Sequence, residues 1–217
     1  MIDCPTIFDI GAHRGDTVAY YRSIFPDSTI YCFEPFPESF EVLKLRFQND
    51  RKIIPSALAI ADKTDRREFF VNHFEATNSL LKRPSIGRRY YHKAGTLKAI
   101  TEVATISIDE FVNRHPLKNT AILKLDIQGG ELAALKGASG MLRGQHAALI
   151  YIEVVFIPLY QDQPLFHDLC GILDDFGYTL FNLYDLQTAD NGQLRYGDAL
   201  FVSEQMRTEV IDKLPDM

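Results

Sequence analysis

Short apolar runs alternate with helical patterns along most of this 217-residue chain, and this alternation constrains the fold more than any other feature. Residues 121–127 and 148–156 are the clearest predicted strands, and a helix from Glu131 to Lys136 separates them. Alternating strands and helices are typical of an α/β sheet with helices on both faces. Further strands are predicted at 6–10, 29–33, 53–59, 69–71, 104–108, 178–184 and 199–203, and further helices at 16–25, from Pro37 onward and at 164–176.

Two details refine this prediction. Pro55 lies within the 53–59 run and cannot donate a ladder hydrogen bond, so that strand is predicted at a sheet edge. A long irregular stretch separates 69–71 from 104–108, and we take residues 72–103 as a candidate substrate lid. The sequence contains no linker, internal repeat or low-complexity tract, and its length suits one well-packed unit. We therefore predict a single domain over residues 1–217.

Charge and cysteine content exclude several classes of protein. The formal net charge is −6, with 23 basic and 29 acidic residues, which argues against broad nucleic-acid binding. The cysteines at positions 4, 32 and 170 are too far apart in sequence for a metal-binding motif, and this favours a reduced, cytoplasmic setting. The most apolar window, 147–160, includes Glu153 and Pro158 and is too short to cross a bilayer. No secretory signal is visible, so a protein without membrane contacts is expected.

A glycine turn follows the first predicted strand. Gly11 and Gly15 allow a sharp turn and a close approach of ligand before a helix N-terminus. A dinucleotide fingerprint would need further glycines at 13 and 16, where the chain has His13 and Asp16. Asp9 beside the turn would repel a pyrophosphate and would suit a cationic amino-acid group. Taken alone, the turn fits a ligand site and a plain strand-to-helix connection equally well.

A second feature is Glu34, which follows the second predicted strand 19 residues after Gly15. At this position in an open parallel sheet a carboxylate can accept hydrogen bonds from both hydroxyls of a ribose. Alone, Glu34 could also be a solvated acid at the start of a loop. Together with the glycine turn, Glu34 favours an adenosine site.

Several motifs carry a family resemblance. The sequence resembles the FkbM-type methyltransferases from about residue 6 to about residue 203. The most specific block is Leu-Lys-Leu-Asp-Ile-Gln-Gly-Gly-Glu. The matching segments are Phe-Asp-Ile-Gly-Ala-x-x-Gly-Asp-Thr at 8–17, Phe-Glu-Pro at 33–35, Asn-Ser-Leu at 78–80, the specific block at 123–131, Leu-Lys-Gly-Ala at 135–138, and parts of 152–160 and 177–181.

The resemblance implies a class I methyltransferase fold, a Rossmann-like, seven-stranded, mostly parallel sheet with helices on both faces. It implies binding of S-adenosylmethionine and methylation of an oxygen on a sugar or other secondary metabolite. By this resemblance Asp9 and Gly11 line the methionine end, Glu34 holds the ribose, and Ser56 and Ala57 lie near the adenine. The remaining expected cofactor-binding positions are His13, Gly15, Thr17, Pro35 and Asp126.

The sequence departs from the family pattern in two places. His13 stands where the family more often has Asn, which indicates a different contact or an added role. Few residues precede the first strand, so an N-terminal substrate cap found in many relatives is expected to be absent or supplied elsewhere.

Asp126 and Glu153 are the candidate catalytic residues. They lie at the carboxyl ends of two predicted adjacent strands, where such sheets bind ligands. Either could be the base that removes the acceptor proton, or the pair could hold a divalent cation such as Mg²⁺. Asp126 could instead cap the following helix. Glu131, in the first turn of that helix, is expected to interact with the helix dipole.

Residues 82–98 are rich in Lys, Arg and Tyr and contain no acid. This segment could be a lid that recognises a carboxylate or phosphate on an acidic acceptor, or it could be a solvated loop. Tyr160 could shape the acceptor pocket or belong to the core. Three other functions stay open: an NAD-dependent oxidoreductase on a similar fold, an RNA-binding or RNA-modifying protein that uses residues 82–98, and a non-catalytic adenosyl-binding module. The sequence fixes neither the acceptor nor the oligomeric state.

Overall fold

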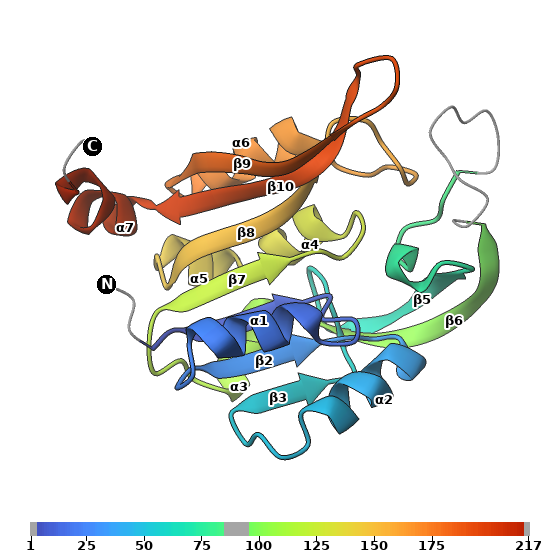
Figure 1. The fold of residues 1–217 in the computed structure, drawn as a ribbon, viewed down its shortest axis with the longest axis horizontal. Coiled ribbons are helices and arrows are strands. Elements are labelled where there is room, and N and C mark those ends of the chain that lie inside the picture. Colours follow the sequence, from blue (N-terminus) through green and yellow to red (C-terminus); the bar gives the residue numbers. More distant parts are fainter. Residues whose placement is uncertain (1–3, 85–95, 215–217) are drawn as a thin grey trace.

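The computed structural model describes residues 4–84 and 96–214. Its main feature is a seven-stranded sheet with the order β3-β2-β1-β7-β8-β10-β9 (Figure 1). Neighbouring strands from β3 to β8 are parallel, and β10 runs antiparallel to both of its neighbours, β8 and β9. The predicted seven-stranded, mostly parallel α/β sheet is confirmed. The strands are β1 Thr6–Ile10, β2 Thr29–Phe33, β3 Ile53–Ser56, β7 Ala121–Leu125, β8 Ala147–Val155, β9 Tyr178–Thr188 and β10 Leu194–Ser203.

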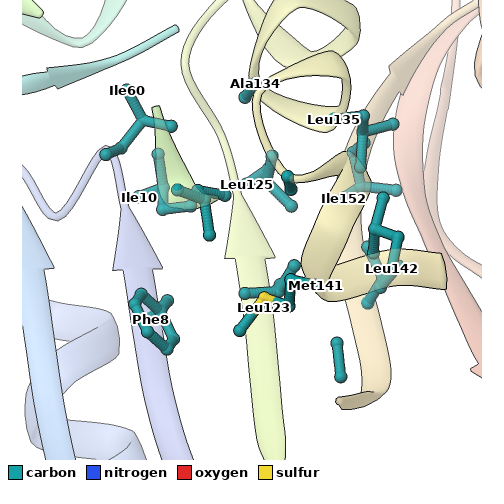
Figure 2. Packing of buried hydrophobic residues seen from close by; sticks show 14 of the residues in the cluster. Phe8, Ile10, Ile60, Leu123, Leu125, Ala134, Leu135, Met141, Leu142 and Ile152 are labelled. Atoms are coloured by element: carbon teal, nitrogen blue, oxygen red, sulfur yellow. The ribbon is translucent and has the colours of Figure 1, made fainter. Parts of the chain in front are cut away.

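Helices cover both faces of this sheet, as predicted. On one face, α1 (Asp16–Ile24) and α2 (Pro37–Arg46) bury Val18 and Leu43 against Ile7 of β1. On the other face lie α3 (Ile108–Arg114), α4 (Glu131–Lys136), α5 (Ser139–Arg143) and α6 (Phe166–Asp175). Phe8 and Leu123 belong to this larger core, which Figure 2 shows from close by. Because β1 and β7 are buried on both faces, their sequences are continuous apolar runs rather than alternating ones.

Pro55 lies in β3, which is an edge strand of the main sheet, as predicted. The predicted strand 53–59 is wrong in its extent, because the chain leaves the main sheet after Ser56. Ala59–Ile60 is a separate strand, β4, which pairs in parallel with residues 105 and 106. This one apolar run therefore contributes a strand to each of the two sheets. The chain bends between these strands at the carboxyl edge of the main sheet.

A second, three-stranded sheet has the order β4-β6-β5, with β5 at Asp65–Asn72 and β6 at Leu97–Ile106. The predicted strands 69–71 and 104–108 are too short, and the second also ends too late, because Ile108 begins α3. Ser107 caps this helix, and its Oγ accepts the Glu110 N–H at 3.2 Å. Residues 97–102 are exposed, so antiparallel pairing with β5, rather than an apolar pattern, defines this strand. Figure 1 shows the small sheet, with β5 and β6 labelled, beyond the arrowhead of β2.

Other elements were not predicted from sequence, namely α3, α5, a helix α7 at Glu204–Glu209, and the short 3-10 helices η1 (Glu75–Thr77) and η3 (Ile211–Lys213). Strands β9 and β10 are also longer than the predicted 178–184 and 199–203, since their outer halves pair with each other. Across 4–84 and 96–214, no helix has the length and apolar character that spanning a membrane requires.

Candidate functional site

A cavity of about 270 Å³ lies at the carboxyl edge of the main sheet, next to the second sheet. The turn after β1, the end of β2 and the segment after β7 form its floor, while β4, β5 and the segment around η1 form its opposite wall. Such a crevice at the strand ends is where open α/β sheets bind ligands. Its lining includes Gly11, His13, Asp16, Thr17, Glu34, Pro35, Phe36, Ile60, Phe69, Glu75, Asn78, Leu80, Lys124, Asp126 and Gln128.

The glycine turn is shaped by close packing against the strand ends. Gly11 has a φ of 82°, and a Cβ at this position would lie 1.9 Å from the carbonyl oxygen of Asp126. The N–H groups of Gly11 and Ala12 both donate to the carbonyl of Phe33. Residue 11 must therefore be glycine for the turn to lie against the end of β7.

Glu34 is 7% exposed and holds this turn from the end of β2. Its Oε2 accepts the His13 N–H at 2.9 Å, and its Oε1 accepts the Phe36 N–H at 2.8 Å. Burial raises the pKa of Glu34 to about 7, although the two hydrogen bonds favour the ionised form. An ionised carboxylate has lone pairs for further donors, so Glu34 can also accept hydrogen bonds from a ligand in the cavity.

Lys124 is a buried cation beneath the turn, and it was not predicted from the sequence as a site residue. Its Nζ donates to the Gly11 carbonyl at 3.0 Å and lies 3.1 Å from Asp9 Oδ1. It also lies 3.9 Å from Asp126 Oδ2. The contact with Asp9 is an ion pair, since neither Asp9 oxygen makes a well-directed hydrogen bond within the described residues. Burial lowers the pKa of Lys124, but the two carboxylates raise it by more, so the side chain stays charged.

The candidate catalytic acids, Asp126 and Glu153, are linked through one side chain, that of Gln128. Its Nε2 donates to Asp126 Oδ1 at 3.1 Å and to Glu153 Oε2 at 2.9 Å. Burial and the neighbouring acids raise the pKa of Glu153 well above its ordinary value. Among the residues the structure describes, no three His, Cys, Asp or Glu side chains form a group that could hold a metal ion.

The expected cofactor-binding residues divide into two sets. Gly11, His13, Thr17, Glu34, Pro35 and Asp126 line the cavity, while Asp9, Gly15, Ser56 and Ala57 are not among its lining residues. Asp9 is fully buried and shares the face of β1 that carries Ile7, which packs toward α1 and α2. Gly15 precedes α1, and a Cβ there would lie 2.5 Å from the Phe47 ring. The contacts of these four positions with a ligand stay predictions.

The segment around η1 lines the cavity on the side of the second sheet. From the sequence, this segment was predicted only as part of the lid at 72–103. Glu75 Oε2 lies 2.8 Å from Arg14 Nη2 and 3.9 Å from His13 Nε2, across the cavity mouth. Ser79 Oγ donates to the Gln128 carbonyl at 2.8 Å. Within the predicted lid at 72–103, residues 97–103 are in β6. Most of the basic segment 82–98 lies outside the described residues, but Arg83 is described, and its guanidinium lies 4.9 Å from the centre of the Tyr160 ring.

Glu131 stabilises the turn behind Asp126, and its burial predicts a pH effect on stability. It is 3% exposed, Oε1 accepts the Ile127 N–H at 3.0 Å, and burial raises its pKa to about 7. Because its pKa in the unfolded chain is about 4.3, the folded state binds the proton more tightly. The stabilisation that this tighter proton binding gives is fully present below about pH 4.3 and is lost as the pH rises through 7.

Between pH 6 and pH 8.5, we therefore expect the free energy of unfolding to fall by about 1–1.5 kcal/mol more in the wild type than in the Glu131→Gln variant. Urea unfolding at several pH values measures this slope. Exposed Glu41 provides the control, since Glu41→Gln should leave the slope unchanged. Equal slopes for the Glu131→Gln variant and the wild type would contradict burial of an acid with a raised pKa.

The sheet order, the single antiparallel strand and the cavity at the carboxyl edge define the fold of the class I methyltransferases. Fibrillarin from Aeropyrum pernix, solved with natively bound S-adenosyl-L-methionine, shares the fold with a TM-score of 0.50 at 14% identity, over 93% of this chain and 69% of that one. Precorrin-6y C5,15-methyltransferase from Geobacter metallireducens matches with a TM-score of 0.51 at 10% identity, over 93% and 81%. At these identities the likeness shows the fold alone.

The chain belongs to the FkbM methyltransferase family, since the family profile "Methyltransferase FkbM domain" matches residues 9–180. Hexuronic acid methyltransferase AglP of Haloferax volcanii is 24% identical over 150 residues, and the match covers 68% of this chain. The chain spans 55% of the length of AglP. The 2-O-methyltransferase NoeI of Sinorhizobium fredii is 21% identical over 178 residues, covering 79% of this chain and 72% of NoeI. The resemblance stated from the motifs is confirmed, and the NAD-dependent oxidoreductase is not favoured.

Proposed function

We propose that this protein is an S-adenosylmethionine-dependent O-methyltransferase that acts on a hydroxyl of a small molecule, a sugar or other secondary metabolite. The observation that carries the proposal is that Glu34 and the two candidate catalytic acids lie at the same edge of the sheet. Glu34 and Asp126 line the cavity there, and Glu153, near the carboxyl end of β8 and not itself among the lining residues, is linked to Asp126 through Gln128. One site can therefore hold a nucleoside and place proton acceptors beside it.

The lining fits S-adenosylmethionine. Glu34, when ionised, has free lone pairs for the ribose hydroxyls. Gly11 leaves room for the backbone turn to approach the methionine end, and Asp126 and Lys124 put charges of both signs on the floor. Ile60 and Phe69 supply an apolar wall that suits an adenine ring. When bound, the cofactor supplies an activated methyl group on a sulfonium.

The residues of the chain then have two tasks, to orient the acceptor oxygen and to remove its proton. Orientation in line with the donor supplies much of the rate in such transfers. A positioned base adds about 10²–10⁴-fold. Asp126 and Glu153 carry out the second task, and Gln128 keeps their carboxyl groups together.

Two observations support a sugar acceptor, including an acidic one. The relatives AglP and NoeI are named as a hexuronic acid methyltransferase and a 2-O-methyltransferase. In this chain, the Arg83 guanidinium lies beside Tyr160, whose hydroxyl is 2.9 Å from Gln128 Oε1. A cation near the linked acids would suit a uronic acid carboxylate.

Release of S-adenosylhomocysteine tests the proposal with a panel of neutral hexoses and the matching uronic acids, each with Mg²⁺ and with EDTA. We expect turnover with at least one sugar, and a loss of about 10²–10⁴-fold in the Asp126→Asn/Glu153→Gln double variant. Exposed Asp175 gives the control, because Asp175→Asn should retain full activity. Full activity of the double variant would contradict the assignment of these acids.

A further inference from the structure

Gln128 has an unusual backbone conformation for its residue type. Its φ is 57°, in the left-handed region, and Gly129 follows with a φ of 104°. A side chain makes this conformation costly, so such residues persist where their surroundings hold them in place. The Gln128 carbonyl accepts the Ser79 hydroxyl at 2.8 Å, so a segment from the second sheet fixes the turn. The strained turn directs the Gln128 side chain toward the ends of β7 and β8.

The amide of Gln128 is contacted at both ends. Tyr160 Oη lies 2.9 Å from Gln128 Oε1 and receives a hydrogen bond from Arg83 Nη2 at 3.2 Å. The carbonyl end of the amide therefore faces a hydroxyl, and the NH₂ end faces the two acids. The Tyr160 hydroxyl has one proton and two acceptors at 2.9 Å, the Thr77 carbonyl and Gln128 Oε1, so the two acids at the NH₂ end fix the orientation of the amide.

The two acids differ in how their oxygens are used. Asp126 Oδ1 accepts from Gln128, and Asp126 Oδ2 faces the Lys124 ammonium at 3.9 Å. Glu153 Oε2 accepts from Gln128 at 2.9 Å, while Glu153 Oε1 has no hydrogen-bond partner among the described residues. Glu153 is partly exposed, so this oxygen is not sealed within the core.

We propose that Glu153 Oε1 is the proton acceptor of the methyl transfer and that Gln128 is the positioning residue that leaves this oxygen free. The inference rests on the proposed function and decides between its two acids. As an electron pair of the acceptor oxygen forms the new C–O bond, the pair of the breaking S–C bond returns to sulfur, and the hydroxyl proton goes to Glu153 Oε1. Asp126, held by Gln128 and Lys124, lines the cavity and would supply a carboxylate beside a bound cofactor.

The surroundings of Glu153 predict a pH dependence. Asp126, Glu131 of α4 and Asp198 of β10 all face it and oppose its ionisation, as burial does, while the Gln128 N–H favours the ionised form. Tyr160 is also near, with its pKa raised by burial. Because the base must be ionised, the rate should increase as the pH rises through the pKa of Glu153.

The first test needs no acceptor. In the full chain labelled with ¹³C at glutamate carboxyl groups, the NMR signal that is missing in Glu153→Gln reports the titration of Glu153. Gln128→Met should raise its pKa by about one to two pH units, because the ionised form loses a hydrogen bond. The control is Gln145→Met, which changes a glutamine with a similar φ of 53° and a hydrogen-bonded amide, and should leave the signal unchanged. No shift in Gln128→Met would overturn the inference.

The second test separates the two acids kinetically, on the sugar with the highest rate in the panel. We expect Glu153→Gln to lower kcat by about 10²–10⁴-fold with an unchanged Kd for S-adenosylmethionine, and Gln128→Met to move the pH profile of kcat upward. A larger loss of kcat in Asp126→Asn than in Glu153→Gln would overturn the assignment. Failure of the wild type to bind S-adenosylmethionine would instead contradict the proposed function, so the two failures are distinguishable.

Discussion

Glu34→Gln is expected to weaken the binding of S-adenosylmethionine by about ten-fold to several-hundred-fold, which corresponds to one or two hydrogen bonds to a charged acceptor. Glutamine keeps only one acceptor oxygen, so one of the N–H groups of His13 and Phe36 loses its acceptor and the turn is weakened as well. Glutamine also loses the charge and one of the oxygens that a ribose needs. Isothermal titration of both proteins at pH 8 measures the difference.

The pH dependence of binding gives a second view of the same residue. Since burial raises the pKa of Glu34 to about 7, much of the free protein carries a neutral carboxyl at pH 6. Affinity for S-adenosylmethionine should therefore increase between pH 6 and pH 8 in the wild type and stay nearly constant in Glu34→Gln. Exposed Glu38, in the first turn of α2, is the control, because Glu38→Gln should behave as the wild type. Equal affinities of Glu34→Gln and the wild type at pH 8 would exclude the role of this carboxylate.

Lys124→Met is expected to lower the free energy of unfolding by about 3–5 kcal/mol, because it leaves the fully buried Asp9 without its cation. Methionine fills a similar volume, so little of this loss comes from packing. The Gly11 carbonyl also loses its donor, and the glycine turn should loosen. Urea unfolding at pH 7.5 measures the loss.

A double variant shows whether the loss comes from the buried charge. Asp9→Asn/Lys124→Met removes both charges and should recover most of the stability. In Lys124→Met alone, the loss should become smaller at pH 5, because the unpaired Asp9 can then take up a proton. A single variant as stable as the wild type would contradict the buried ion pair.

The main sheet was predictable because its central strands are buried on both faces. Residues 6–10 and 121–125 are continuous apolar runs that local pattern can detect. The second sheet was not predictable in full, since residues 97–102 of β6 are exposed and are strand only through pairing with β5. Helix α5, only 5 residues long, gives no detectable periodicity, and Asp109 of α3 caps it through the N–H groups of Gly140 and Met141.

The candidate site was predictable where local motifs and the sheet order decide position. Glu34 and Asp126 follow strands, so they had to meet at the carboxyl edge. The roles of Lys124 and Gln128 depend on contacts across several segments, which no local pattern encodes. A signal did exist for Lys124, since a lysine within an apolar strand needs a buried partner. For Glu75, the partner Arg14 lies 61 positions away in the sequence, and only the fold brings them together.

Isothermal titration of the full chain with S-adenosylmethionine, with NAD as the parallel ligand, tests the central claim most directly. The cavity predicts micromolar binding of S-adenosylmethionine, weakened in Glu34→Gln, and no heat with NAD. Heat with NAD and none with S-adenosylmethionine would contradict the assignment of the cavity as a methyl-donor site.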